Sequence, residues 1–145
     1  MKVIIKKEYD GTRYVGSCEN LPGCFTQSHS AEELMILMRR AIELYRKSYA
    51  DRQQPLPQGS DFPYLDKKIR FHKISAAQLT GLLQKSGYHL EHQDDGLLLF
   101  RKMRFPFNRL VIPNASEISP LIISKIFSKE NVIYVNKRPL NANTA

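Results

Sequence analysis

Hydrophobic and polar positions in the first part of the chain predict three short strands. Residues 3–5 form an apolar stretch, and Asp10-Gly11 after it is a strong signal for a hairpin turn. Residues 14–18 supply the returning strand, and residues 24–27 can form a third after Leu21-Pro22-Gly23 interrupts the chain. This segment therefore predicts a three-stranded antiparallel sheet.

A long helix is expected directly after these strands. Ser30 and Glu33 match a capping box, in which each side chain binds a backbone N–H that the helix leaves unpaired. The apolar side chains that follow recur at helical spacing: Leu34, Leu37, Met38, Ala41, Ile42 and Tyr45. Such a helix buries its apolar side against one face of the sheet and turns its charged side toward water.

The remainder of the chain predicts the order helix, three strands, helix. Ser75 and Gln78 form a second capping box, and Ser119-Pro120 places a cap and an N-terminal proline before the last helix. The expected elements are a helix from residue 75 to Gly87, strands at 88–93, 97–104 and 109–112, and a helix at 121–129. Residues 131–136 form one more short strand, for which the sequence suggests no partner.

A proline-rich segment separates these two groups of elements. Residues 53–63 contain three prolines, one glycine and no periodic apolar pattern, as expected for a linker. We therefore expect an α+β protein with two small domains, residues 1–52 and residues 67–145, joined by a linker at 53–66. Each domain is near the lower size limit for independent stability, so the two should pack on each other.

The positive charge of the chain is concentrated in the second domain. The whole chain has a formal charge of +8. Residues 67–145 contain thirteen Lys and Arg against five Asp and Glu, whereas residues 1–52 carry a net of +2 and residues 53–66 a net of −2. A basic surface of this kind attracts polyanions such as RNA, although it also serves to keep a small domain soluble.

The sequence argues against secretion, membrane insertion, a metal and a cofactor. No apolar run approaches the roughly 20 residues of a membrane helix, and the start of the chain lacks the apolar core of a signal peptide. We therefore expect a cytoplasmic protein in which Cys18 and Cys24 are reduced and buried. Two cysteines and four scattered histidines do not make a metal site, and we find no cofactor motif.

The first domain resembles the HicB antitoxin domain. The resemblance rests on Tyr14-Val15-Gly16, on the block from Glu19 to Gln27 (ENLPGCFTQ), and on Ser30 to Leu34 (SAEEL) followed by Ala41-Ile42. It covers about residues 1–50. It implies a partial ribonuclease-H-like β-β-β-α fold without the nuclease carboxylates, and therefore a binding module that is not an enzyme.

The second domain resembles the HicA messenger-RNA interferase toxin, which has a double-stranded-RNA-binding-like α-β-β-β-α fold. The resemblance is carried by Leu79 to Leu83, Ser86-Gly87-Tyr88, Phe100-Arg101, Arg109, Val111 and Pro113. HicA toxins have a histidine, taken as the catalytic general acid/base, at the start of the second strand, where this chain has Leu97 and Leu98. Leucine cannot exchange a proton with the 2′-hydroxyl or the leaving oxygen. Losing one general acid/base typically costs about 100- to 10,000-fold in rate.

His89 and His92 are the nearest candidates to replace the missing histidine. They lie three residues apart on the first strand of this domain, so strand alternation places them on opposite faces of the sheet. They are therefore not expected to act as a pair, although either one could face an RNA-binding groove.

Basic and aromatic residues alternate around the second and third strands of this domain. The basic side chains can neutralise backbone phosphates, and the aromatic ones can stack on unpaired bases. The set consists of Arg101, Lys102, Arg104 and Arg109, with Phe105 and Phe107 between them. The alternative is that the basic side chains only face water from a strand while the phenylalanines lie in the core.

These features together suggest a non-catalytic fused protein of the HicB–HicA type with an RNA-binding or regulatory role. Two alternatives stay open: an active endoribonuclease silenced by its own N-terminal domain, and an interaction protein that sequesters a separate toxin or antitoxin. RNA is the expected partner. The two halves should contact each other, either within one chain or by exchange between the chains of a homodimer.

Overall fold

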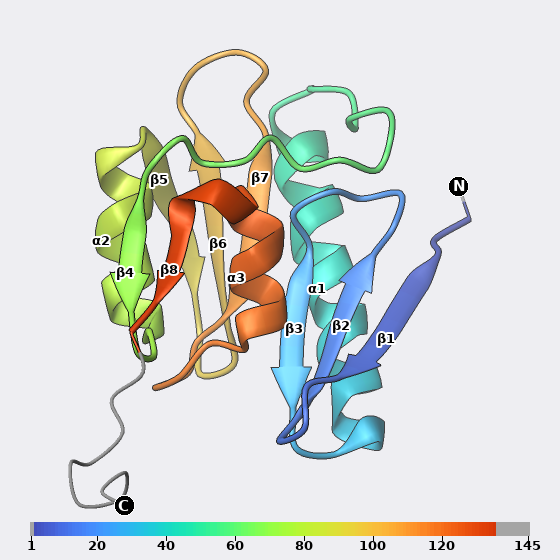
Figure 1. The fold of residues 1–145 in the computed structure, drawn as a ribbon. Coiled ribbons are helices and arrows are strands. Elements are labelled where there is room, and N and C mark those ends of the chain that lie inside the picture. The colour runs from blue at the N-terminus through green and yellow to red at the C-terminus, as the bar shows by residue number, and fades with distance from the viewer. Residues whose placement is uncertain (1, 136–145) are drawn as a thin grey trace, which may run out of the picture.

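The computed structural model describes residues 2–135, which have mixed α and β structure. Strands β1 (Ile5–Tyr9), β2 (Tyr14–Cys18) and β3 (Phe25–Ser28) form an antiparallel sheet in that order. Helix α1 (Ala31–Asp51) packs on one face of β2 and β3 (Figure 1). The predicted order of three strands and one helix is therefore confirmed.

The rest of the described chain supplies a second antiparallel sheet and two further helices. Its elements are β4 (Ile69–Phe71), α2 (Ala76–Lys85), β5 (Tyr88–Gln93), β6 (Leu97–Lys102), β7 (Arg109–Pro113), α3 (Pro120–Ile126), a 3-10 turn (Lys129–Asn131) and β8 (Val132–Tyr134). Strands β5, β6 and β7 pair in that order. The α+β class and the order helix, three strands, helix are confirmed.

The short strand predicted at residues 131–136 has a partner that the sequence analysis missed. Strand β8 pairs in parallel with β4, with Ile69 opposite Val132. Strand β4 has only three residues and lies in the segment after the prolines, far from its partner in the sequence. Asn136, and the remainder of the predicted second domain up to residue 145, lie outside the described residues.

The helix starts are held by the predicted serine caps, but the first capping box is only half formed, because the N–H of Ser30 donates to Ser28 Oγ and not to Glu33. The hydroxyl of Ser30 accepts a hydrogen bond from the backbone N–H of Glu33 at 3.2 Å. The capping box of α2 is complete, because Gln78 N–H donates to Ser75 Oγ at 3.1 Å and Ser75 N–H donates to Gln78 Oε1 at 2.9 Å. Ser119 caps α3 through the N–H of Leu121. These bonds satisfy donors that a helix leaves unpaired.

The two sheets join edge to edge where β3 lies beside β7 (Figure 1). Cys24 and Val111 form a parallel bridge, and the N–H of Val111 donates to the carbonyl oxygen of Gly23 at 2.7 Å. Gly23 has a φ of +94°, and a Cβ at this position would collide with the carbonyl oxygen of Arg109. A glycine is therefore needed for the two halves to approach this closely. The strands run in the spatial order β1-β2-β3-β7-β6-β5.

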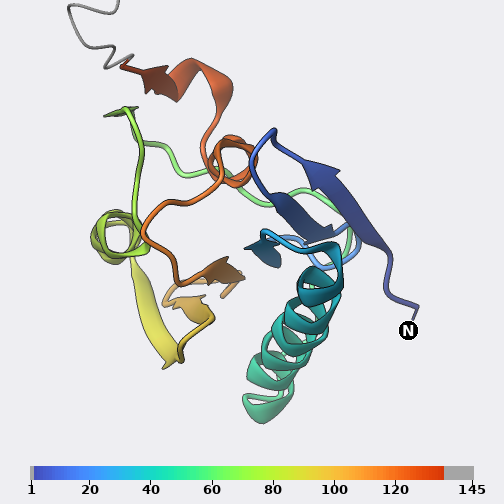
Figure 2. The same ribbon diagram turned by 90° about the horizontal axis from the view of Figure 1, so that it is seen from below.

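Each face of this composite sheet has its own hydrophobic core, and each core draws residues from both halves of the chain. Figure 2 shows α1 on one face and α2 and α3 on the other. The α1-face core contains Cys18, Leu21, Cys24, Leu34, Met38, Ala41, Tyr45, Tyr49, Leu97, Leu99 and Val111. The α2/α3-face core includes Val15, Phe25, Phe62, Leu65, Leu79, Leu83, Leu98, Phe100, Leu110, Ile112, Ile122, Ile123, Ile126 and Phe127. The cores therefore follow the faces of the sheet and not the two segments of the sequence.

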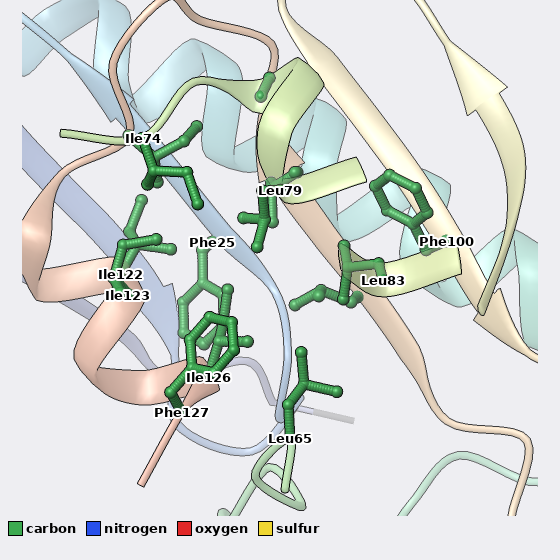
Figure 3. Close-up of a cluster of buried hydrophobic side chains, with 14 of the residues drawn as sticks. Phe25, Leu65, Ile74, Leu79, Leu83, Phe100, Ile122, Ile123, Ile126 and Phe127 are labelled. Carbon is green, nitrogen blue, oxygen red and sulfur yellow. The ribbon is translucent and has the colours of Figure 1, made fainter. Parts of the chain in front are cut away.

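The segment expected as a linker also contributes to the α2/α3-face core. Phe62 and Leu65 are buried there, and the N–H of Leu65 donates to the carbonyl oxygen of Ile126 at 2.8 Å. Figure 3 shows Leu65 beside Phe127, with Phe25 from β3 pointing into the same cluster. Residues 53–66 thus contain no helix or strand, but part of the segment is packed against the folded body.

Candidate functional site

The positions that the resemblance assigns to the missing histidine are both buried, but on opposite faces of β6. Leu97 lies in the α1-face core, and Leu98 lies in the α2/α3-face core. At the turn before them, a Cβ on Gly96 would be 3.2 Å from Cδ2 of Leu37 and 3.4 Å from a guanidinium nitrogen of Arg40. Helix α1 therefore lies directly over the start of β6 on the side of Leu97.

An ion pair with the β5–β6 turn holds α1 at this position. Arg40 on α1 donates to Asp94 Oδ2 at 2.5 Å, and the Oδ1 atom of Asp94 accepts the N–H groups of Gly96 and Leu97, each at 2.9 Å. Burial raises the pKa of Asp94, but hydrogen bonds from His92, the two backbone groups and Arg40 outweigh it and hold that pKa well below its ordinary value. Asp94 is therefore a carboxylate that links α1 to the β5–β6 turn.

The prediction that His89 and His92 face opposite sides of the sheet is wrong. His89 pairs with Arg101 and His92 with Leu99, and these two residues of β6 share a face. A β-bulge between Leu90 and His92 inserts one residue into β5, which reverses the alternation beyond it. Both histidines consequently lie on the α1 face. His89 is exposed there, and Nε2 of His92 is 2.9 Å from Asp94 Oδ2.

Arg109 does not reach the surface, so the expectation that it binds phosphate needs correction. The residue is 0% exposed. Its guanidinium donates to the hydroxyl and carbonyl oxygens of Ser48 at 2.8 and 2.9 Å and to Gln54 and the carbonyl of Phe107 at 2.6 Å each. It also lies 4.1 Å from the ring centroid of Tyr49. Arg109 is thus a structural side chain that fastens the end of α1 to β7.

The side chain of Arg101 is also mostly unavailable to a polyanion such as RNA. Its Nε donates to Glu91 Oε1 at 2.9 Å, and its side chain is only 11% exposed. Arg52, at the end of α1, contacts the same carboxylate oxygen at 3.1 Å, and Ser48 donates to the other oxygen. Burial raises the pKa of Glu91, but the hydrogen bonds from Ser48, Arg101 and Arg52 outweigh it and lower that pKa. Arg101 therefore neutralises a carboxylate of its own protein.

A groove of about 420 Å³, here called the α1 groove, opens beside this network, between the C-terminal part of α1 and strands β5 and β6. It is lined by Leu44, Lys47, Ser48, Asp51, Arg52, Glu91, His92 and Leu99. The groove holds one imidazole beside carboxylates, which is a set that could exchange protons. His92 is hydrogen-bonded to Asp94, and Glu91 is neutralised by Arg52 and Arg101. Both groups therefore already have partners within the protein.

Lys102 and Arg104 lie outside these networks, near the loop between β6 and β7. Lys102 Nζ donates to the carbonyl oxygen of Ser86 at 2.9 Å and lies 5.0 Å from the ring centroid of Tyr88. Arg104 is exposed, and Phe105 next to it is 83% exposed. Neither Phe105 nor Phe107 belongs to a hydrophobic core. The predicted basic set is thus divided, with Arg104 on the surface and Lys102 partly accessible.

Two residues that were not predicted from the sequence accompany this loop. Tyr64 and Lys67, from the segment after the prolines, line a groove of about 430 Å³ together with Lys102 and Phe105. Tyr64 is 58% exposed. No local pattern marks these residues, because the groove exists only when this segment packs beside the β6–β7 loop.

The described residues offer no other obvious chemistry. Within residues 2–135, no three His, Cys, Asp or Glu side chains are grouped to hold a metal ion. Cys18 and Cys24 are free and buried, and burial raises the pKa of both thiols. No helix in this part of the chain has the length and apolar character needed to cross a bilayer.

Fold and site together define an α+β protein in which a helix from the first half covers the sheet of the second half. A UPF0150 protein of Archaeoglobus fulgidus is 49% identical over 43 residues, which is 30% of this chain and 61% of that relative. UPF0150 proteins of Thermoplasma acidophilum and Synechocystis sp. are 39% identical over 58 residues and 40% identical over 55 residues, covering 83% and 68% of those relatives. The chain therefore belongs to the UPF0150 family.

The family match is partial. It covers 30% to 40% of this chain, and the chain spans less than two thirds of the length of the Archaeoglobus fulgidus relative. No family model and no solved structure matches the chain. The name UPF0150 states no activity.

Proposed function

We propose that this protein is a non-catalytic fused antitoxin–toxin-type protein of the HicB–HicA kind that binds RNA. Its first segment would be the antitoxin-like β-β-β-α unit, and its second the toxin-like α-β-β-β-α unit. The observation that most directly supports the proposal is the burial of Leu97 beneath α1. This leucine occupies the position of the toxin histidine by resemblance, and it lies in the core beneath α1.

Two features support loss of catalysis in this proposal. A leucine at the general acid/base position cannot transfer a proton. In addition, α1 is fastened at both ends of the covered region, by Arg40 with Asp94 near the start of β6 and by Ser48 with Arg109 at the start of β7. An RNA backbone would have to displace this helix to reach Leu97.

The family match also supports the antitoxin-like part of the proposal. The UPF0150 matches span 43 to 58 residues, close to the length of the segment that resembles HicB. The residues after the segment that resembles HicB contain three strands with flanking helices. A short match of this kind, in a chain with a second group of elements, fits a fusion of two partners.

The direct test is to incubate the full-length protein with end-labelled RNA and to follow cleavage and binding together. We expect bound RNA that stays intact. Cleavage that disappears in His92→Ala but persists in His72→Ala would overturn the proposal, because His72 is exposed and outside the α1 groove. Failure to bind any RNA would equally overturn its RNA-binding part.

A silenced endoribonuclease is the second candidate, and the imidazole of His92 beside the carboxylates of the α1 groove favours it. It predicts that loosening α1 exposes an activity. The full chain carrying Arg40→Ala and Arg52→Ala loses two ion pairs between α1 and the second segment. RNA cleavage that appears in this variant and requires His92 would favour the second candidate. Continued absence of cleavage would favour the first.

A further inference from the structure

We propose that the groove between residues 63–67 and the β6–β7 loop binds single-stranded RNA, with bases stacked on Tyr64 and Phe105. This site rests on the proposed RNA-binding function and specifies where it resides. It does not include the position of the toxin histidine, because α1 covers Leu97. It keeps Lys102, Arg104 and Phe105 of the predicted basic and aromatic set and adds the segment at residues 63–67. The groove has a volume of about 430 Å³ and lies at the opposite end of β6 from Leu97.

The exposed aromatic side chains are the first support for this site. Phe105 is 83% exposed and Tyr64 58%, and both line the groove. Phe105 is braced by Phe107, whose ring packs edge-on at a centroid distance of 6.0 Å. An aromatic ring that is held in position and left uncovered offers a flat surface on which an unpaired base can stack.

The charge around the groove fits a phosphate backbone. Lys67 and Lys102 line it, and Lys68 and Arg104 are adjacent in the sequence and exposed. Lys102 is held by Ser86 at the groove wall, so it presents a fixed positive charge. Cations beside stacking rings are the combination found where proteins follow a single strand.

One carboxylate in the groove favours RNA over DNA. Asp66 lines the same groove and is exposed. A carboxylate repels phosphates unless the ligand offers it a hydrogen-bond donor, and the ribose 2′-hydroxyl is such a donor. Asp66 among these lysines therefore suits a ligand that carries both phosphates and hydroxyls.

The test is fluorescence anisotropy with the full-length protein and a labelled eight-nucleotide RNA, compared with DNA of the same sequence and with the RNA duplex. Tyr64→Ala and Phe105→Ala should each weaken RNA binding by about 5- to 100-fold. Arg104→Gln should lower the slope of log affinity against log salt by about 0.7. The single-stranded RNA should bind at least about tenfold more tightly than the duplex, because stacking requires unpaired bases.

Matched controls separate the groove from the rest of the surface. Tyr9 has the same exposure as Tyr64, 58%, but lies on β1, and Arg39 is an exposed arginine on α1. Tyr9→Ala and Arg39→Gln should leave RNA affinity within twofold. All variants should keep the circular dichroism of the parent, since the changed side chains are exposed.

The outcomes are distinguishable. RNA binding that is equally strong in Tyr64→Ala and Phe105→Ala would overturn this site and leave the proposed RNA-binding function standing. Absence of RNA binding by the unmodified protein would overturn both. Equal affinity for the DNA strand or for the duplex would overturn the assignment to single-stranded RNA, and capture of a peptide or protein by Phe105 without RNA binding would assign the groove to a different partner.

Discussion

Both faces of the composite sheet have a hydrophobic centre with polar bonds around it, but these bonds hold different elements. On the α2/α3 face, Phe25 of β3 lies among the isoleucines of α3 (Figure 3). The polar bonds on this face reach α3 and the loop before it: Gln27 donates to the carbonyl oxygen of Glu117, Ser119 donates to Asp10, and Lys125 pairs with Glu8. On the other face, the polar bonds hold α1. Tyr45 OH donates to the carbonyl oxygen of Pro22 at 2.6 Å, Arg109 binds Ser48, and Asp94 binds Arg40.

This comparison separates the roles of the two kinds of contact. Apolar burial is favourable for many arrangements of similar volume, so the two cores supply stability without strongly specifying direction. Hydrogen bonds with defined geometry are satisfied by few arrangements, so the polar bonds specify where α3 lies on one face and where α1 lies over β6 and β7 on the other. Helix α1, which covers Leu97, is therefore positioned by polar groups, and the burial of the two hydrophobic cores stabilises the arrangement.

The largest expected effect comes from Phe25→Ala, which removes a buried ring from the first segment. Phe25 is 4% exposed and lies in a core built mainly from the second segment. We expect the free energy of unfolding to fall by about 3–5 kcal/mol, as for other buried aromatic truncations. Urea denaturation followed by circular dichroism and by tyrosine fluorescence should show one transition that shifts as a whole.

The matched control for this variant is Tyr9→Ala, since Tyr9 is exposed. It should change stability by less than about 0.5 kcal/mol. Two separate transitions in Phe25→Ala, with only one of them shifted, would contradict the shared core and show that the halves unfold independently.

The next effect concerns the polar edge of the α1 face. Arg109→Met keeps most of the side-chain length but leaves the oxygens of Ser48, Gln54 and Phe107 without their donor. Buried acceptors without partners are costly, so we expect a loss of about 2–4 kcal/mol, measured by urea denaturation. Arg104→Met should cost less than about 0.5 kcal/mol, because Arg104 is exposed. Equal effects of the two substitutions would remove the distinction between an anchoring and a surface arginine.

A smaller effect is expected for a single hydroxyl on the same face. Tyr45→Phe retains the ring, which is fully buried, and removes the hydroxyl that bonds to Pro22 and to Tyr49. The carbonyl of Pro22 then loses its partner beside the turn that leads to Gly23, and stability should fall by about 1–2 kcal/mol. Tyr14→Phe is the control, since the Tyr14 ring is only partly buried. No loss in Tyr45→Phe would mean that the hydrogen bond to Pro22 does not help to position α1.

Most elements of the fold could be predicted because their signals are local. The caps at Ser30, Ser75 and Ser119 stand next to the helices they start, and Asp94-Asp95-Gly96 sits between the strands it joins. Strand β4 could not be predicted, since three residues have no clear period and its pairing with β8 depends on the folded chain. The bridge between Cys24 and Val111 could not be predicted either, because it also depends on the folded chain.

The candidate site was harder to predict than the fold, because charge and sequence position do not determine burial. Arg104 and Arg109 look equivalent in the sequence, yet one is exposed and the other is surrounded by acceptors from α1. Strand alternation placed His89 and His92 on opposite faces, and one bulged residue reverses that result. Tyr64 joins Phe105 at a groove only after the intervening segment has folded.

The smallest effect tests the carboxylate that ties α1 to the β5–β6 turn. Asp94 has a folded-state pKa well below its ordinary value of 3.8, because hydrogen bonds from His92, Gly96, Leu97 and Arg40 outweigh the effect of burial. A lowered folded pKa contributes stability that is present above the unfolded pKa and is lost as pH falls below it toward the folded value. Acid should therefore weaken the attachment of α1 below about pH 4.

Asp94→Asn removes this dependence while keeping an oxygen that can accept the N–H groups of Gly96 and Leu97. At pH 7 the variant should be less stable by about 1 kcal/mol or less, since the Arg40 pair is partly exposed. The difference from the parent should shrink as pH falls from 4 toward 2, measured as urea midpoints at each pH. Asp51→Asn, which alters an exposed pair within α1, should show no such convergence. Parallel pH profiles for the parent and Asp94→Asn would mean that the carboxylate does not position the helix, and the polar edge of the α1 face would then reduce to Arg109 and its acceptors.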